Sequence, residues 1–214
     1  MTDSIKKLIE ISSDSLSEED PYFDNLKFNI SGVLKAELQE MLRRKNGFYA
    51  FEAALHVLPS TLRDISPEMT LIKWNDVSLW KNEFTDENVS SSLFFAEDIF
   101  GVQFCVKDDA IYTFDPETCE FEEMCSSLEE WALTITKDYE VLTGFPVAHE
   151  WQVKHGRIQP NSRLLPKVPF ICGGEFNIDN MHEVESVRGM KFRASIARQV
   201  QNLPDGAKLK LVLE

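Results

Sequence analysis

The sequence lacks any apolar run of the roughly 18 residues that a membrane-spanning helix requires. Its first ten residues alternate lysine, glutamate and aliphatic side chains, so they also lack the apolar stretch of a signal peptide. We therefore expect a soluble, cytoplasmic protein that does not bind membranes.

Paired cysteines are missing too. Cys105, Cys119, Cys125 and Cys172 form no C-x-x-C pair, and all but Cys125 lie in apolar or strand-like stretches. This pattern predicts reduced, buried thiols rather than a disulfide framework.

Familiar catalytic motifs are absent as well. The chain has no G-x-S-x-G, P-loop, G-x-G-x-x-G or H-E-x-x-H sequence, and its four histidines show no spacing typical of a metal site. We therefore expect a protein that is not an enzyme and that needs neither a metal nor another cofactor.

Two patterns keep a small hydrolase as a less favoured alternative. Cys172 precedes two glycines, and a thiol on a tight turn can act as a nucleophile with His149 or His182 as its base. The adjacent carboxylates of Glu97 and Asp98 can support acid–base chemistry. Neighbouring side chains of a strand point to opposite faces, however, so we favour structural or partner-binding roles for this pair.

Basic residues are nearly absent from the middle of the chain. Residues 83–140 contain 16 acidic residues and only two basic ones, Lys107 and Lys137. This segment accounts for the formal net charge of −14, because the residues before and after it carry −3 and +3. An acidic surface repels nucleic acid and attracts a basic protein, although its simplest role is to maintain solubility.

Helices are predicted where apolar residues recur every three or four positions. Ser127 and Glu130 fit a capping box, and Ser31 can cap a second helix that Gly47 ends. The expected helices span residues 1–11, 32–46, 71–84, 128–142 and 190–202.

Strands are predicted in three places. A meander is expected over residues 93–124, with turns at 108–109 and 115–118 and with Glu120 and Glu122 on its outer face. A hairpin is expected within residues 168–176, and a last strand where leucine alternates with lysine after residue 207.

The order of these elements predicts an α+β fold with a mainly antiparallel sheet and helices packed on it. Residues 149–168 look irregular, and the Ser-rich, acidic residues 12–25 look like a linker. We predict an N-terminal helical extension over residues 1–29 and a single domain over residues 30–214.

Six stretches of the sequence together carry a family likeness. They are FFAEDIFGVQFCV (94–106), the turn DPET (115–118), SLEEWA (127–132), LTG (142–144), RLLPKVPF (163–170) and GGEF (173–176). In these stretches the sequence resembles the SUKH superfamily, over roughly residues 30–214. Their glycines, aromatic residues and turn residues are structural, so they are more specific for a fold than for a partner.

The resemblance implies an α+β domain that binds other proteins, and it transfers no catalytic residue. The bacterial members imply an immunity protein that neutralises a cognate toxin, often a nuclease. The fungal Smi/Knr-type members imply the alternative, an intracellular scaffold or regulator of cell-wall-related processes.

The expected partner is therefore a basic toxin domain, bound by the acidic outer face and turns of the meander. The residues predicted to contact it are Glu97, Asp98, Asp108, Asp109, Asp115, Glu117, Glu120 and Glu122.

Overall fold

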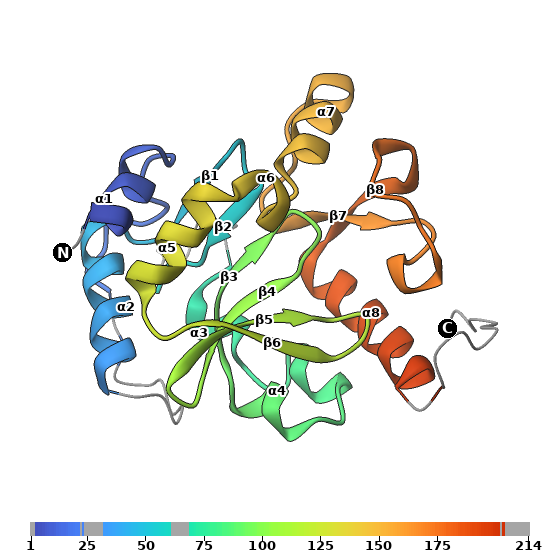
Figure 1. The fold of residues 1–214 in the computed structure, drawn as a ribbon, viewed down its shortest axis with the longest axis horizontal. Helices are drawn as coiled ribbons and strands as arrows, with labels where there is room; N and C mark the ends of the chain where they lie inside the picture. The colour runs from blue at the N-terminus through green and yellow to red at the C-terminus, as the bar shows by residue number, and fades with distance from the viewer. Residues whose placement is uncertain (1–2, 22, 24–31, 61–68, 202, 204–214) are drawn as a thin grey trace.

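A computed structural model describes residues 3–21, 23, 32–60, 69–201 and 203 of the chain (Figure 1). Its α-helices are α1 (Asp3–Glu10), α2 (Gly32–Arg44), α3 (Leu71–Trp74), α4 (Glu87–Ser91), α5 (Leu128–Lys137), α6 (Tyr139–Leu142), α7 (Phe145–His155) and α8 (Ser186–Val200). Its 3-10 helices are η1 (Lys81–Glu83), η2 (Phe170–Cys172) and η3 (Ile178–Asn180). Its strands are β1 (Phe48–Ala50), β2 (Leu55–Val57), β3 (Leu93–Asp98), β4 (Gln103–Lys107), β5 (Ala110–Asp115), β6 (Glu120–Cys125), β7 (Ser162–Pro166) and β8 (Met181–Glu185).

Strands β1 to β6 form one antiparallel sheet in chain order, and β7 pairs with β8 in a second, two-stranded sheet. The predicted α+β class with a mainly antiparallel sheet is therefore confirmed. The meander is in register through Phe104, Thr113 and Glu122, which lie opposite one another on neighbouring strands. Directly opposed residues share a face, so this row of side chains projects from one side of the sheet.

Aromatic side chains cover both faces of the sheet. On one face, Trp131 of α5 packs against Phe95 and Phe104, with ring centroids 5.1 and 5.8 Å away. On the other face, Trp80 lies 5.1 Å from Phe94. Helix α5 spans only part of its face (Figure 1), and the end of the meander that holds the β5–β6 turn extends beyond it.

The capping prediction for α5 is confirmed in part. The Ser127 hydroxyl accepts a hydrogen bond from the N–H of Glu130, whereas the Glu130 carboxylate accepts from Ser126 rather than from Ser127. Helix α5 ends at Lys137 with Asp138 as its C-cap, so the single helix expected to reach residue 142 is divided into α5 and α6.

The N-terminal helix packs into the main core. Ile5 and Leu8 of α1 are buried, and the Glu129 carboxylate of α5 accepts hydrogen bonds from the N–H groups of Ser4 and Ile5. The division of the chain near residue 29 stays a prediction, but the described part of the extension shares the hydrophobic core of the domain.

Three local predictions are wrong. Residues 71–84 do not form one helix, because the Asn75 side chain bonds both to Leu71 within α3 and to Phe94 of β3. The supposedly irregular residues 149–168 contain most of α7 and all of β7. Residues 168–176 form η2 and a left-handed turn at Gly173 instead of a hairpin.

Two further predictions, the Ser31 cap and the strand after residue 207, lie outside the described residues. Within the described ranges, no helix is both long enough and apolar enough to cross a membrane.

Candidate functional site

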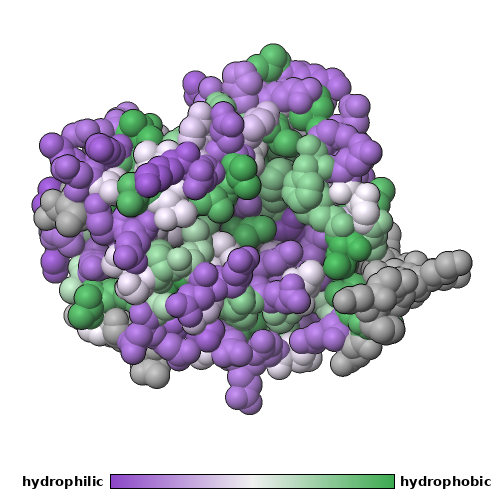
Figure 2. Space-filling view, viewed as in Figure 1, coloured by the Kyte–Doolittle hydropathy of each residue, from purple (hydrophilic) through white to green (hydrophobic). Residues whose placement is uncertain are grey.

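A cleft of about 1030 Å³ lies where α5 leaves the sheet uncovered. Its base is the face of β4, β5 and β6, and its sides are the segment that joins α6 to α7 and the segment that contains η2. Figure 2 shows apolar side chains around a hollow to the right of the centre, in the area that these elements occupy in Figure 1.

The sides of the cleft are apolar and partly open to solvent. Phe170 and Phe176 stack with ring centroids 3.8 Å apart, and both contact the edge of Phe100. Phe176 is 64% exposed, and Val141 on the α6 side is 83% exposed. Exposed apolar side chains at the mouth of a cleft are typical of a binding surface.

Gly144 permits the close approach of the α6–α7 segment to the β3–β4 turn. Its φ of +68° is left-handed, and a Cβ at this position would lie 2.4 Å from the ring of Phe100. Any other residue would therefore displace the aromatic side of the cleft.

Four carboxylates line the rim. Asp115 and Glu120 are a cross-strand pair at the β5–β6 turn, Glu122 follows on β6, and Glu140 comes from α6. The register places Asp115, Glu120 and Glu122 on the same face of the sheet. The rim therefore presents negative charge from two sides of the cleft.

Arg193 of α8 lies at the floor of the cleft and is only 2% exposed. Its Nε atom is 3.6 Å from Glu117 Oε1, which makes an ion pair but is too long for a hydrogen bond. Among the described residues, Arg193 Nε and Nη1 have no hydrogen-bond partner. Buried donors without an acceptor are costly and uncommon, so an acceptor that reached the floor of the cleft would satisfy donors that the described residues leave unpaired.

Asp98, at the end of β3, is the second charged group of the floor. Its Oδ1 atom accepts hydrogen bonds of 2.8 Å from the N–H groups of Phe100 and Val102. Burial raises the pKa of Asp98 to about 7, although Arg193 and these two N–H groups act in the opposite direction. Burial also raises the pKa of Glu117, again against the effect of Arg193.

A second buried charge network lies on the other side of β3. Glu97 Oε1 is 2.9 Å from Arg163 Nη2 and 3.2 Å from His56 Nδ1, and Gln103 donates to Oε2. Burial alone would raise the pKa of Glu97, but Arg163, His56 and Gln103 outweigh it and hold this pKa below its ordinary value.

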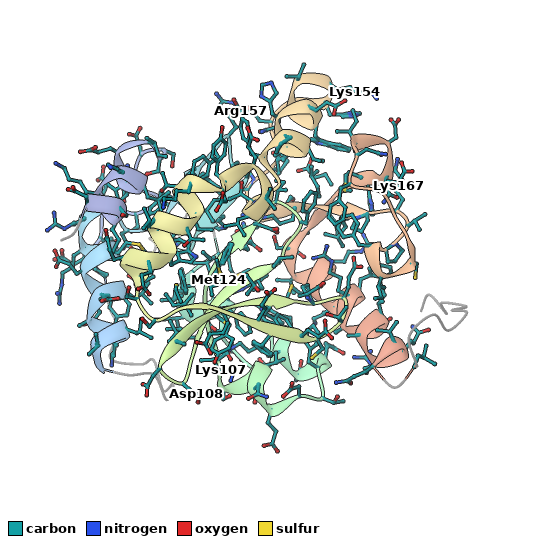
Figure 3. All side chains as sticks on the ribbon, in the orientation of Figure 1. Lys107, Asp108, Met124, Lys154, Arg157 and Lys167 are labelled. Atoms are coloured by element: carbon teal, nitrogen blue, oxygen red, sulfur yellow. The ribbon has the colours of Figure 1, made fainter. Side chains whose placement is uncertain are left out.

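The eight predicted contact residues therefore do not form one surface. Asp115, Glu120 and Glu122 do line the cleft, whereas the exposed Asp108 and Asp109 lie at the β4–β5 turn and are not among its lining residues. Figure 3 shows Asp108 at the lower edge of the molecule. The other three predicted residues are buried and do not lie on an outer face. Glu97 and Glu117 pair with Arg163 and Arg193, whereas Asp98 lies at the floor of the cleft.

Sequence reasoning missed Arg193, Phe176 and Glu140. Glu140 belongs to the acidic segment and lies within the helix predicted over residues 128–142, so its charge was a usable signal. No comparable signal exists for Arg193, because it lies 95 residues beyond Asp98 and its burial depends on how α8 packs.

The residues of the hydrolase alternative are not assembled around one another. Burial, together with the charge of Glu117, raises the pKa of the Cys172 thiol. His149 Nδ1 contacts the Glu52 carboxylate at 2.8 Å, and His182 Nδ1 lies 3.0 Å from the carbonyl of Leu165. In the described part of the chain, no three His, Cys, Asp or Glu side chains are grouped so as to hold a metal ion.

Comparisons with known proteins identify no family for this chain. No family model matches it, and no curated protein does. Among solved structures, the chain is similar to Atu4351 from Agrobacterium tumefaciens, with a TM-score of 0.47 and 15% sequence identity. That likeness covers 84% of this chain and 85% of the other.

Proposed function

We propose that this protein binds a basic partner protein in the cleft and that it serves in the cytoplasm as an immunity protein against a toxin. The observation that carries the proposal is the convergence of four rim carboxylates on a cleft with exposed apolar sides. Such a surface offers an apolar contact area together with charges that select a basic partner.

The charges act mainly on specificity and on the rate of association. Carboxylates at a solvated rim attract a basic surface over about 8–10 Å at moderate salt, and they are screened at higher salt. The apolar centre, with Phe176 and Val141 at its mouth, then supplies contacts that persist when salt is added.

The toxin role rests on the SUKH resemblance of the sequence. A toxin that acts on nucleic acid carries a basic substrate-binding surface, and an acidic protein neutralises it by covering that surface. We therefore expect the partner to be a basic toxin domain, such as a nuclease.

Capture experiments with the full chain as bait test the binding site. The variant with Glu120→Lys and Glu122→Lys changes the rim, and the variant with Asp108→Lys and Asp109→Lys makes the same change in charge at the opposite end of the meander. We expect one basic partner to be retained by the unmodified chain and by the Asp108/Asp109 variant. Its association with the Glu120/Glu122 variant should be at least about tenfold slower at low salt. Equal losses for both variants would remove the cleft from consideration.

The toxin role is tested by expressing the captured partner in a bacterial host. Growth arrest by the partner alone, relieved by co-expression of this chain but not of the Glu120/Glu122 variant, is the expected result. A partner without toxicity would contradict the immunity role and favour the scaffold or regulator role.

A further inference from the structure

The two edges of the six-stranded sheet differ in how they are covered. At β1, residues 13–17 run alongside the edge, with hydrogen bonds from Ser13 N–H to the Tyr49 carbonyl and from Leu16 N–H to the Gly47 carbonyl. At β6, the described residues offer no such cover, and β5 is the only strand that pairs with β6. An uncovered edge strand presents a row of N–H and C=O groups that can pair with another chain.

Side chains on β6 restrict what can pair with this edge. Glu120 and Glu122 point into the cleft. Phe121 points to the other face of the sheet, where its ring packs against that of Phe114 with centroids 4.7 Å apart. Glu120, Glu122 and the exposed Glu123 would repel the same edge of a second copy of the chain. A strand added here is favoured when basic residues lie opposite the glutamates and apolar residues alternate with them.

The floor of the cleft adds a second requirement. The buried donors of Arg193 lack an acceptor in the described structure, and a polypeptide supplies acceptors through its carbonyl groups. A simple polyamine would satisfy the rim carboxylates but would bring no acceptor to Arg193.

We propose that the partner binds by adding an extended segment, in which basic and apolar residues alternate, to the edge of β6 as a seventh strand. This inference rests on the proposed function and specifies how the partner is recognised. Backbone hydrogen bonds to β6 supply affinity, and the rim carboxylates and the apolar sides of the cleft select the side chains.

The test uses the synthetic peptide AKLKLV, which has the required alternation and repeats residues 207–212 of this chain. The full chain is titrated with the peptide while amide hydrogen exchange is followed by NMR. We expect slower exchange at alternate amides within residues 120–125, which are those that point away from β5. Spermine, as a matched cation without a peptide backbone, should leave these amides unprotected.

Two N-methylated peptides make the test specific for strand addition. One carries methyl groups on the first, third and fifth amides, and the other on the second and fourth. Because only one set of amides faces β6, one peptide should lose at least about tenfold in affinity while the other binds nearly as well as the parent. Equal affinities for the two peptides would overturn strand addition but would leave the charge-reversal test of the cleft unaffected.

A shortened chain that ends at residue 203 tests whether the C-terminal residues of this protein compete with the peptide for the edge of β6. We expect it to bind the peptide as the full chain does. Binding to the shortened chain alone would mean that the C-terminal residues of this protein take the edge, and this would overturn the assignment of the edge to a partner.

Discussion

Glu97 and Asp98 are adjacent on β3, yet the structure places their carboxylates in opposite electrostatic situations. Glu97 faces Arg163, His56 and Gln103, and its pKa is lowered. Asp98 faces the cleft floor, and burial raises its pKa to about 7. The alternation of side chains along a strand therefore separates a fully paired carboxylate from one whose charge is poorly supported.

The different surroundings of Glu97 and Asp98 show that burial alone does not tell whether a charged residue supports the fold or belongs to a binding site. The Glu97 network lies behind the cleft and connects β2, β3, β4 and β7. Asp98 and Arg193, in contrast, line the cleft itself, and Glu117 pairs with Arg193. Both Arg163 and Arg193 have donor atoms without a hydrogen-bond partner among the described residues, so it is contact with the cleft that distinguishes the two groups. We interpret the first as a support of the fold and the second as part of the binding site.

Replacing Arg163 should have the largest effect on stability. Arg163→Met leaves Glu97 buried without its main counter-charge, which costs about 3–5 kcal/mol of the free energy of unfolding. Urea denaturation at pH 7 measures the loss. Arg157→Met, on the exposed loop nearby, is the matched control and should change stability by about 0.5 kcal/mol or less. Similar values for the two variants would show that Glu97 does not depend on Arg163.

A pH series separates the two carboxylates. The folded pKa of Asp98 is raised, so ionisation destabilises the folded state progressively between about pH 4 and 7 and fully above pH 7. Asp98→Asn should therefore gain stability over the unmodified chain as pH rises through this window, by on the order of 4 kcal/mol at pH 8.

Glu97→Gln should behave in the opposite way. The folded pKa of Glu97 is lowered, so its stabilising effect is present above its unfolded pKa and is lost as pH falls through the folded pKa. This variant should be less stable than the unmodified chain at pH 7, and the difference should shrink in acid. If the difference in stability between Asp98→Asn and the unmodified chain stayed constant from pH 4 to 8, the raised pKa of Asp98 would be contradicted.

Replacing Arg193 should destabilise the protein less than replacing Arg163. Arg193→Met also leaves two carboxyl groups buried, but Asp98 and Glu117 both have raised pKa values and can take up a proton instead. We expect a loss of about 1–2 kcal/mol in urea denaturation at pH 7, smaller than that of Arg163→Met. A loss as large as that of Arg163→Met would mean that the cleft floor supports the fold as strongly as the Glu97 network does.

Local signals in the sequence predicted much of the fold. Helix α1, helix α2, the cap at Ser127 and the strands of the meander depend on neighbouring residues, and those predictions agree with the structure. Helix α7 escaped prediction because only Ala148 and Trp151 are buried along it, which leaves no apolar stripe to read. The hairpin of β7 and β8 escaped because a long segment, rather than a two-residue turn, joins its strands.

The sign of the charge at the site was predictable, but its distribution between surface and interior was not. Asp115 and Glu120 lie on a turn and are paired by the meander itself, so local reasoning located them. Glu97 and Glu117 depend on arginines of β7 and α8, which pack against them from far along the chain. Burial of this kind is a tertiary property, and a single sequence does not reveal it.

The contact between α1 and α5 also bears on the order of events during synthesis. The first N–H groups of α1 find their acceptor in Glu129, which is 125 residues downstream of Ser4. At typical translation rates the ribosome needs roughly 6–25 s to add that length of chain. A helix of eight residues is marginal on its own. The N-terminal helix is therefore made early but becomes stable late, when the centre of the protein has left the ribosome.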